Sequence, residues 1–173
     1  MQQQRVISFI VSNQPGVLCR ISGLISRRGF NIDSLTVGVT ADPSLSRITI
    51  VMYADDSVIE QVIKQFDKLL DVKAIKEIPP EKGAMREVAL MKLSLGDDRR
   101  ELMEDIAARG GVVLDIGETT TTIQLTGTVS FINESIETLR KYGIAEIART
   151  GMVALERGDS VLNGEFGQPE NNF

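Results

Sequence analysis

The stretch RVISFIVSNQPGVLCRISGLISRR, residues 5–28, decides the fold of the first half of this chain. Residues 5–11 are rich in β-branched side chains and apolar on both faces, which is typical of a buried strand. From residue 16 to residue 28 apolar side chains recur at helical spacing, which predicts an amphipathic helix. The turn sequence NQPG (13–16) joins the two. The apolar residues on one face of this helix are Val17, Leu18, Ile21, Leu24 and Ile25.

The rest of the first half continues this pattern. The expected strands are 31–39, 45–53 and 72–78, and a second helix covers 56–70. The order is therefore β-α-β-β-α-β. With right-handed crossovers, this order makes a four-stranded antiparallel sheet with both helices on one face. The first strand becomes central and the second strand becomes an edge.

The second half repeats the first after PPEKGA (79–84), where two prolines and a glycine predict a domain boundary. Its expected elements are strand 86–95, helix 98–110, strands 112–118 and 120–127, helix 132–143 and strand 144–151. Matching positions lie 81 residues apart and later 75 apart. The pairs are Ile7 with Val88, Phe9 with Leu90, Ile25 with Ile106, Gly29 with Gly110 and Ile48 with Ile123. We predict an α+β fold of two tandem ferredoxin-like βαββαβ domains.

Composition narrows the class of protein. The 173 residues carry a net charge of −5, which divides into +1 for residues 1–80 and −6 for residues 81–173. Neither half has the basic surface of a nucleic-acid binder. There is no apolar run long enough for a membrane span and no signal-peptide pattern, and the chain has one cysteine. We therefore expect a cytoplasmic protein with neither nucleic acid nor membrane as partner.

The absence of histidine weighs against catalysis, because histidine is the most common general base and a frequent metal ligand. Cys19 lies in a predicted helix, where we expect it to pack rather than to act as a nucleophile. The acidic pairs at 55–56 and 97–98 precede helices, so we expect helix caps rather than metal ligands. We predict no catalytic residue and no metal site.

Two features indicate an oligomer. The edge strand, residues 33–39, lacks the lysine or proline that protects an exposed edge. The first strand carries Val6 and Ile10 on the face opposite the helices, so that face should also meet protein.

The segments NQPGVLCRISGLISRRGFNIDSLTVG (13–38) and LSRITIV (45–51) resemble the N-terminal ACT domain of the small, regulatory subunit of acetohydroxyacid synthase, also called acetolactate synthase. The segment GTVSFINESIETLRKYGIAEIARTGMVALERGD (127–159) is similar to the end of that subunit. The likeness covers about residues 5–159. It divides the chain into an ACT domain for effector binding and dimerisation (1–78), a linker (79–84), a second ferredoxin-like domain (85–159) and a flexible tail (160–173).

The resemblance implies a subunit without catalytic activity or cofactor of its own in branched-chain amino-acid biosynthesis. Its partner would be the catalytic large subunit, on which thiamine diphosphate, Mg and FAD are expected. The small subunit would activate that enzyme and make it sensitive to feedback inhibition by valine. From the unprotected edge strand 33–39 and the two-sided apolar strand 6–11 we predict a homodimer through the ACT domain. The implied effector-binding residues are Asn13, Gly16, Val17, Leu18, Asn31 and Ile32.

The chemistry of these residues suits an amino acid. The start of a helix offers free N–H groups and a positive dipole end to a carboxylate. Gly16 allows close approach to the backbone, and Asn31 can accept from an ammonium group. From the residues alone, a plain turn is the more common explanation for the corner at 13–16. The alternatives are an ACT module that senses an amino acid for another enzyme, and a small enzyme on a ferredoxin-like scaffold.

Overall fold

The computed structural model describes residues 3–27 and 31–162, which form two compact units. The first unit combines the chain up to Met85 with the segment from Met152 onward. The second unit comprises Arg86–Gly151. In the described part of the chain, no helix is both long and apolar enough to span a membrane.

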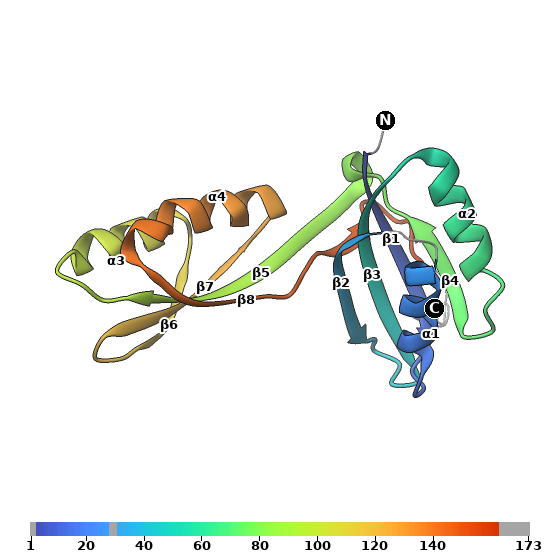
Figure 1. Ribbon diagram of the computed structural model, residues 1–173, viewed down its shortest axis with the longest axis horizontal. Coiled ribbons are helices and arrows are strands. Elements are labelled where there is room, and N and C mark those ends of the chain that lie inside the picture. The colour runs from blue at the N-terminus through green and yellow to red at the C-terminus, as the bar shows by residue number, and fades with distance from the viewer. Residues whose placement is uncertain (1–2, 28–30, 163–173) are drawn as a thin grey trace, which may run out of the picture. The chain divides into compact units, whose positions relative to one another are not determined.

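The first unit has the predicted β-α-β-β-α-β order, and its sheet has the strand order β2-β3-β1-β4. As predicted, β1 is central and β2 lies at an edge. Helices α1 and α2 cover one face of this sheet (Figure 1). The predicted end of the first helix, Arg28 and Gly29, lies outside the described residues. The elements are β1 (Gln3–Ser12), α1 (Val17–Arg27), β2 (Ile32–Val39), β3 (Leu45–Ala54), α2 (Asp56–Phe66) and β4 (Val72–Glu77).

Helix α2 ends at Phe66, four residues before the predicted end. Two tight turns follow, in which Leu69 N donates to Phe66 O and Val72 N donates to Leu69 O. The ring of Phe66 is buried against Phe9 of β1, with ring centroids 5.0 Å apart in an edge-to-face arrangement. This pair anchors the helix side of the core.

The other face of the first sheet is covered by a strand that the sequence did not predict, β9 (Val153–Glu156). Residues beside or within β9 bond to side chains of three strands, twice through main-chain atoms and once through a side chain. Met152 N donates to Ser34 Oγ of β2 (3.4 Å), and Arg47 Nη2 of β3 donates to Ala154 O (3.2 Å). Lys76 of β4 pairs with Glu156. The neighbours Leu35, Ile48 and Ile75 pack on the helix side, so these three side chains lie on the opposite face.

This arrangement corrects part of the oligomer argument. Val6, Ile10 and Val51 on the opposite face are buried, with at most 2% exposed. The prediction that this face meets protein is therefore confirmed, but part of that protein is the chain's own C-terminal segment. Of the two observations that predicted an oligomer, only the unprotected edge of β2 still supports a dimer.

The domain boundaries differ from the prediction for the same reason. Residues 152–159 were assigned to the second domain but belong to the first unit. The expected linker, 79–84, forms a short 3-10 helix (Pro80–Lys82) and runs directly into β5 (Gly83–Ser94). Of the predicted tail, residues 163–173 lie outside the described residues.

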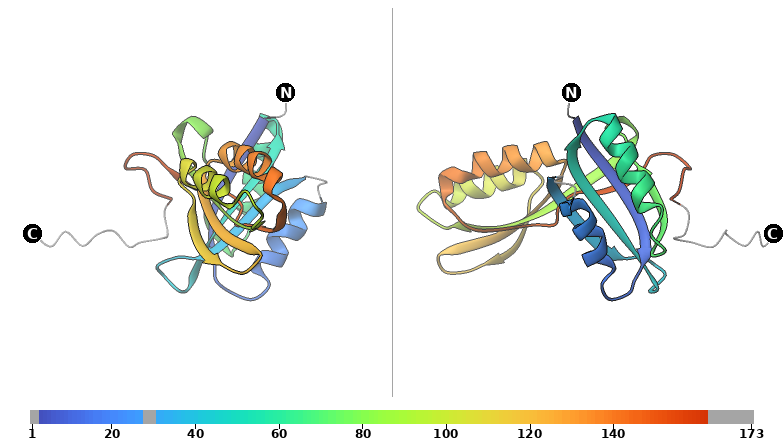
Figure 2. Two further views of the ribbon diagram at one scale, coloured as in Figure 1. Left: turned by 90° about the vertical axis from the view of Figure 1, so that its left-hand side faces the viewer. Right: turned by 45° about the vertical axis from the view of Figure 1, so that its right-hand side comes forward.

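The second unit repeats the first, with strand order β6-β7-β5-β8, and β9 pairs with β5. Helices α3 and α4 lie side by side (Figure 2). Helix α4 begins three residues earlier than predicted, because Thr128 Oγ1 accepts from Phe131 N at 3.2 Å and caps it. The elements are α3 (Arg99–Ala108), β6 (Val112–Ile116), β7 (Thr120–Gly127), α4 (Val129–Leu139), a 3-10 helix (Arg140–Tyr142) and β8 (Ile144–Arg149).

The duplication is confirmed, with one correction to its alignment. Ile106 and Ile123 are buried, as are their counterparts in the first unit. In β5, however, Ala89 and Met91 are fully buried while Leu90 is 40% exposed. The offset along the first strand of each unit is therefore 82 residues rather than 81, because a slip of one residue exchanges the two faces of a strand.

Candidate functional site

The corner between β1 and α1 is held by its own backbone. Gly16 has φ 85°, a left-handed conformation that side chains other than glycine adopt with difficulty. Asn13 fastens the corner to the turn between β2 and β3, since its N donates to Ser44 O (2.7 Å) and its Nδ2 to Pro43 O (2.9 Å). Gly16 and Asn13 thus have structural roles whether or not a ligand binds.

The β2–β3 turn is itself well bonded. Asp42 Oδ1 accepts from Ser44 Oγ at 2.7 Å and from Ser44 N at 2.8 Å. These two hydrogen bonds hold the pKa of the Asp42 carboxyl below its usual value. The corner therefore rests on a rigid support.

The first turn of α1 presents N–H donors to the exterior. Val17 N donates to Gln14 O (3.3 Å), and Arg20 N starts the helical pattern by donating to Gly16 O (3.0 Å). Among the described residues, the N–H groups of Leu18 and Cys19 have no acceptor. This turn contains no acidic residue. Two adjacent donors at the positive end of a helix form a favourable position for a carboxylate.

The side chains in this turn point in different directions. Val17 is buried in the core, so only its backbone borders the corner. Leu18 is 41% exposed and offers the apolar surface that a branched side chain needs. Cys19 is exposed, so the expectation that it packs in the core was wrong. It lies beyond the apolar stripe of Val17, Ile21 and Ile25, on the outer side of the helix.

Arg20 is a feature that the sequence reasoning missed. Its guanidinium pairs with Asp71 Oδ2 through Nη2 (2.6 Å) and Nε (2.9 Å), and about half of its side chain is exposed. A basic residue in the first turn of a helix is unfavourable for the helix dipole, and that signal could have identified it. Arg20 Nη1 lies 3.3 Å from the place that a Cβ on Gly16 would occupy, so the Arg20–Asp71 ion pair borders the corner.

Asn31 and Ile32 lie at the other end of the same sheet. Ile32 is opposite Met52 of β3, whereas the corner follows Ser12, which is opposite Leu45 of β3. Those two positions in β3 are seven residues apart, or about 23 Å at roughly 3.3 Å per residue. A single chain therefore does not bring the six predicted residues together: residues 13–18 lie at one end of the sheet, and Asn31 and Ile32 lie at the other.

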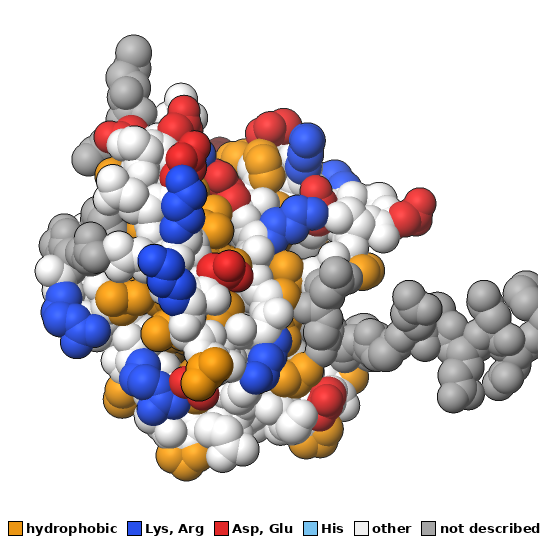
Figure 3. Space-filling model, turned by 90° about the vertical axis from the view of Figure 1, so that its right-hand side faces the viewer, with side chains coloured by type: hydrophobic (Ala, Val, Ile, Leu, Met, Phe, Trp, Pro, Cys, Tyr) orange, Lys and Arg blue, Asp and Glu red, His pale blue; other side chains and the backbone are white. Residues whose placement is uncertain are grey.

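The other candidates behave largely as caps. Asp55 Oδ1 accepts from Val58 N (3.1 Å) and caps α2, as expected. Asp98 precedes α3 without a side-chain cap bond. No group of potential metal ligands occurs among the described residues. Basic, acidic and hydrophobic side chains are intermixed on the face shown in Figure 3.

Comparison with known proteins places both halves in one family. A family model of the AHAS small subunit-like ACT domain matches residues 7–74. A second model, of the small subunit of acetolactate synthase, matches residues 86–158.

Individual relatives match this chain along nearly their whole length. A probable acetolactate synthase small subunit of Archaeoglobus fulgidus is 42% identical over 157 residues, which are 90% of this chain and 98% of the relative. The isozyme 3 small subunit of Escherichia coli is 38% identical over 161 residues, covering 92% of this chain and 99% of the relative. The crystal structure of the acetolactate synthase small subunit from Thermotoga maritima superposes with a TM-score of 0.86 at 37% identity, covering 91% of this chain and 99% of that one. This chain belongs to the family of acetolactate synthase small subunits.

Proposed function

We propose that this chain is the regulatory subunit of acetolactate synthase in branched-chain amino-acid biosynthesis. It binds the catalytic large subunit, raises its activity and makes it sensitive to valine. The reaction, with its thiamine diphosphate, Mg and FAD, belongs to the large subunit. The ligand part of this proposal is supported by the N–H donors of Leu18 and Cys19, for which residues 3–27 and 31–162 supply no acceptor, beside an exposed apolar side chain.

Each part of valine has a matching group. Its carboxylate accepts from the N–H groups of Leu18 and Cys19, in the positive field of the α1 N-terminus. Its branched side chain packs on Leu18 and Ile32. Its ammonium group donates to the side-chain oxygen of Asn31 and to nearby backbone carbonyls.

A dimer brings residues 13–18 of one copy together with Asn31 and Ile32 of the other. The outer edge of β2 is unpaired within its sheet, and Val37 and Val39 are 42% and 61% exposed. If two copies pair their β2 strands in an antiparallel manner, the start of one β2 lies beside the end of the other. The partner subunit's Asn31 and Ile32 then lie next to the corner at 13–18. Each dimer thereby gains two complete effector sites.

Two titrations test this function. The purified chain is titrated calorimetrically with valine, leucine and isoleucine, alone and together with the catalytic subunit. The activity of the reconstituted enzyme is measured over the same concentrations. We expect valine to bind the small subunit and to inhibit only the reconstituted enzyme.

Two results would contradict the proposal. Failure of the chain to raise the activity of its own organism's large subunit would favour an ACT module serving another enzyme. Inhibition of the large subunit by valine without this chain would remove its regulatory role.

A further inference from the structure

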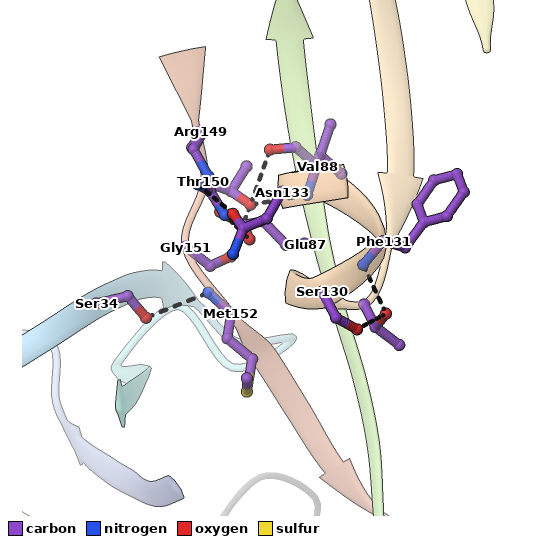
Figure 4. Close-up of polar contacts among 11 residues, drawn as sticks. Ser34, Glu87, Val88, Ser130, Phe131, Asn133, Arg149, Thr150, Gly151 and Met152 are labelled. Atoms are coloured by element: carbon purple, nitrogen blue, oxygen red, sulfur yellow. Dashed lines mark hydrogen bonds and ion pairs between the residues drawn. The ribbon is translucent and has the colours of Figure 1, made fainter. Parts of the chain in front are cut away.

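The segment 149–157, here called the return segment, leaves the second sheet and ends on the first. At its start, Arg149 donates to both carboxylate oxygens of Glu87, at 2.8 and 2.7 Å, and to Asn133 Oδ1 at 2.9 Å (Figure 4). Glu87 is only 3% exposed. A buried bidentate pair with an arginine is a strong, geometrically defined contact. Thr150 N also donates to Val88 O at 3.0 Å, so this end is fixed to β5.

The remainder of the return segment is fixed to the first unit. Its polar contacts there reach β2, β3 and β4: Met152 to Ser34, Ala154 to Arg47 and Glu156 to Lys76. Arg157 N donates to Lys82 O at 2.8 Å. A displacement of β2, β3 or β4 would therefore also displace the return segment.

Gly151 lies between these two sets of contacts. Its φ is 78°, which turns the chain in a way that favours glycine. On one side Thr150 is bonded to β5, and on the other side Met152 is bonded to β2 (Figure 4). One residue, Gly151, thus separates the backbone anchor in the second unit from the backbone anchor in the first.

The contact with β2 lies beside the proposed effector site. The pairing of β2 with β3 shifts register between Ile32 and Ser34, so the strand has a bulge there. A bulge is a place where a strand changes its pairing and direction. Ser34, which accepts from Met152 N, is two residues beyond Ile32, so a ligand that orders Asn31 and Ile32 can act on Ser34 through this bulge.

We propose that the return segment couples effector binding to the second domain, with Ser34 and the Lys76–Glu156 pair as its positioning residues. This inference rests on the proposed function of the effector site. Binding changes the bulge at Ser34, the change displaces Met152, and the backbone transmits it through Gly151 to Arg149. Ser34, Lys76 and Glu156 touch no ligand in this scheme, so they set the response and not the affinity.

The test measures two quantities separately: the affinity of the chain for valine, and the inhibition of the reconstituted enzyme by valine. The variants Ser34→Ala, Lys76→Glu and Glu156→Lys are compared with the charge-exchanged double variant Lys76→Glu/Glu156→Lys. The matched control is Glu60→Lys, which breaks the exposed pair with Lys64 on α2. Each full-length chain is assayed for valine affinity by calorimetry, for thermal stability, and for activity of the reconstituted enzyme without valine and at saturating valine.

For the three single variants we expect wild-type valine affinity within about twofold. The ratio of activity without valine to activity at saturating valine should fall by about 2- to 30-fold, the range in which substitutions along a coupling network act. The double variant should regain most of this ratio, and Glu60→Lys should leave it unchanged. Hydrogen exchange at residues 152–156 should respond to valine in the wild type and not in Ser34→Ala.

Several results would overturn the proposal. Normal inhibition in all three single variants, or no recovery in the double variant, would show that the return segment only stabilises the fold. Loss of valine affinity in the single variants would place these residues in the ligand site itself. A wild-type chain that binds no valine would instead refute the proposed function on which the inference rests.

Discussion

Replacing Gly16 with aspartate puts a carboxylate at the start of α1, where we propose that the carboxylate of valine binds. Two like charges about 4 Å apart repel by about 4 kcal/mol at an effective dielectric constant near 20, and by about 3 kcal/mol at 6 Å. Each 1.4 kcal/mol changes affinity about tenfold. The affinity for valine should therefore fall roughly 100- to 1000-fold.

The backbone at Gly16 requires a control for strain. Its φ of 85° makes most side chains unfavourable there, at a cost of about 1–2 kcal/mol. A Cβ at this position would lie 3.3 Å from Arg20 Nη1, which belongs to a half-exposed side chain and can move. Asparagine tolerates positive φ as aspartate does and has nearly the same shape without the charge. Gly16→Asn therefore reproduces the strain and isolates the effect of charge.

The assay is the activity of the reconstituted enzyme against valine concentration for wild type, Gly16→Asn and Gly16→Asp. We expect activation without valine in all three, and a small, similar loss of melting temperature in both variants. Half-inhibition should require far more valine for Gly16→Asp than for Gly16→Asn. If the two variants give the same inhibition curve, the carboxylate does not bind at this helix terminus and the reasoning fails.

Three further predictions concern the edge strand, the covering strand and pH. Val37→Lys places a charge at the outer edge of β2, so sedimentation should show that the dimer dissociates, and calorimetry should show that valine binding is lost. An unchanged dimer would argue against pairing through β2. Deleting the chain from Met152 onward uncovers Val6 and Ile10, each worth at most about 1.5–3 kcal/mol, so the melting temperature should fall by about 2–4 °C for each kcal/mol lost; an unchanged melting temperature would contradict the role of β9. Hydrogen bonding from Lys76 holds the pKa of Glu156 below its usual 4.5, so the pair stabilises the fold above that pH and its contribution is lost as pH falls through the lowered pKa. The difference in melting temperature between wild type and Glu156→Gln should thus be constant from about pH 8 to 6 and shrink below about 4.5, and a difference that persists at low pH would contradict it.

Local patterns predicted the elements and their order because each carries its own periodicity. The amphipathic helix beginning near Val17, the double-faced apolar strand from Val6 to Val11 and the repeat of both in the second half were sufficient for the fold class. The edge position of β2 followed from the order of elements and the handedness of crossovers.

The covering strand β9 could not be predicted in the same way. Its four residues, VALE, have no diagnostic pattern, and its partners Ser34, Arg47 and Lys76 lie between 80 and 118 residues away in the sequence. The buried residues Val6 and Ile10 indicated only that something covers this face. Long-range contacts of this kind leave no local signature.

The candidate site, too, could be predicted only in part from the sequence. Its chemistry was predictable from Gly16, Leu18 and Asn31 as residue types, but their separation was not. The positive φ of Gly16 and the distance of Asn31 along the sheet appear only in three dimensions. The exposure of Cys19 follows from helical spacing that the prediction did not apply: Cys19 is two residues from both Val17 and Ile21, roughly half a turn of a helix with about 3.6 residues per turn, so it lies opposite the apolar stripe.

Binding of valine to mixed dimers tests most directly whether each effector site is built from α1 of one protomer and the start of β2 of its partner. Chains with Gly16→Asp and chains with Asn31→Ala are co-expressed with different tags, and the hybrid dimers are purified and titrated calorimetrically. Alone, Gly16→Asp should bind roughly 100- to 1000-fold more weakly, and Asn31→Ala about 5- to 150-fold more weakly if a buried group loses its partner. In the hybrid, one site carries both substitutions and the other carries neither, so we predict one valine bound per dimer with wild-type affinity. A hybrid that binds no better than its parents would contradict a shared site.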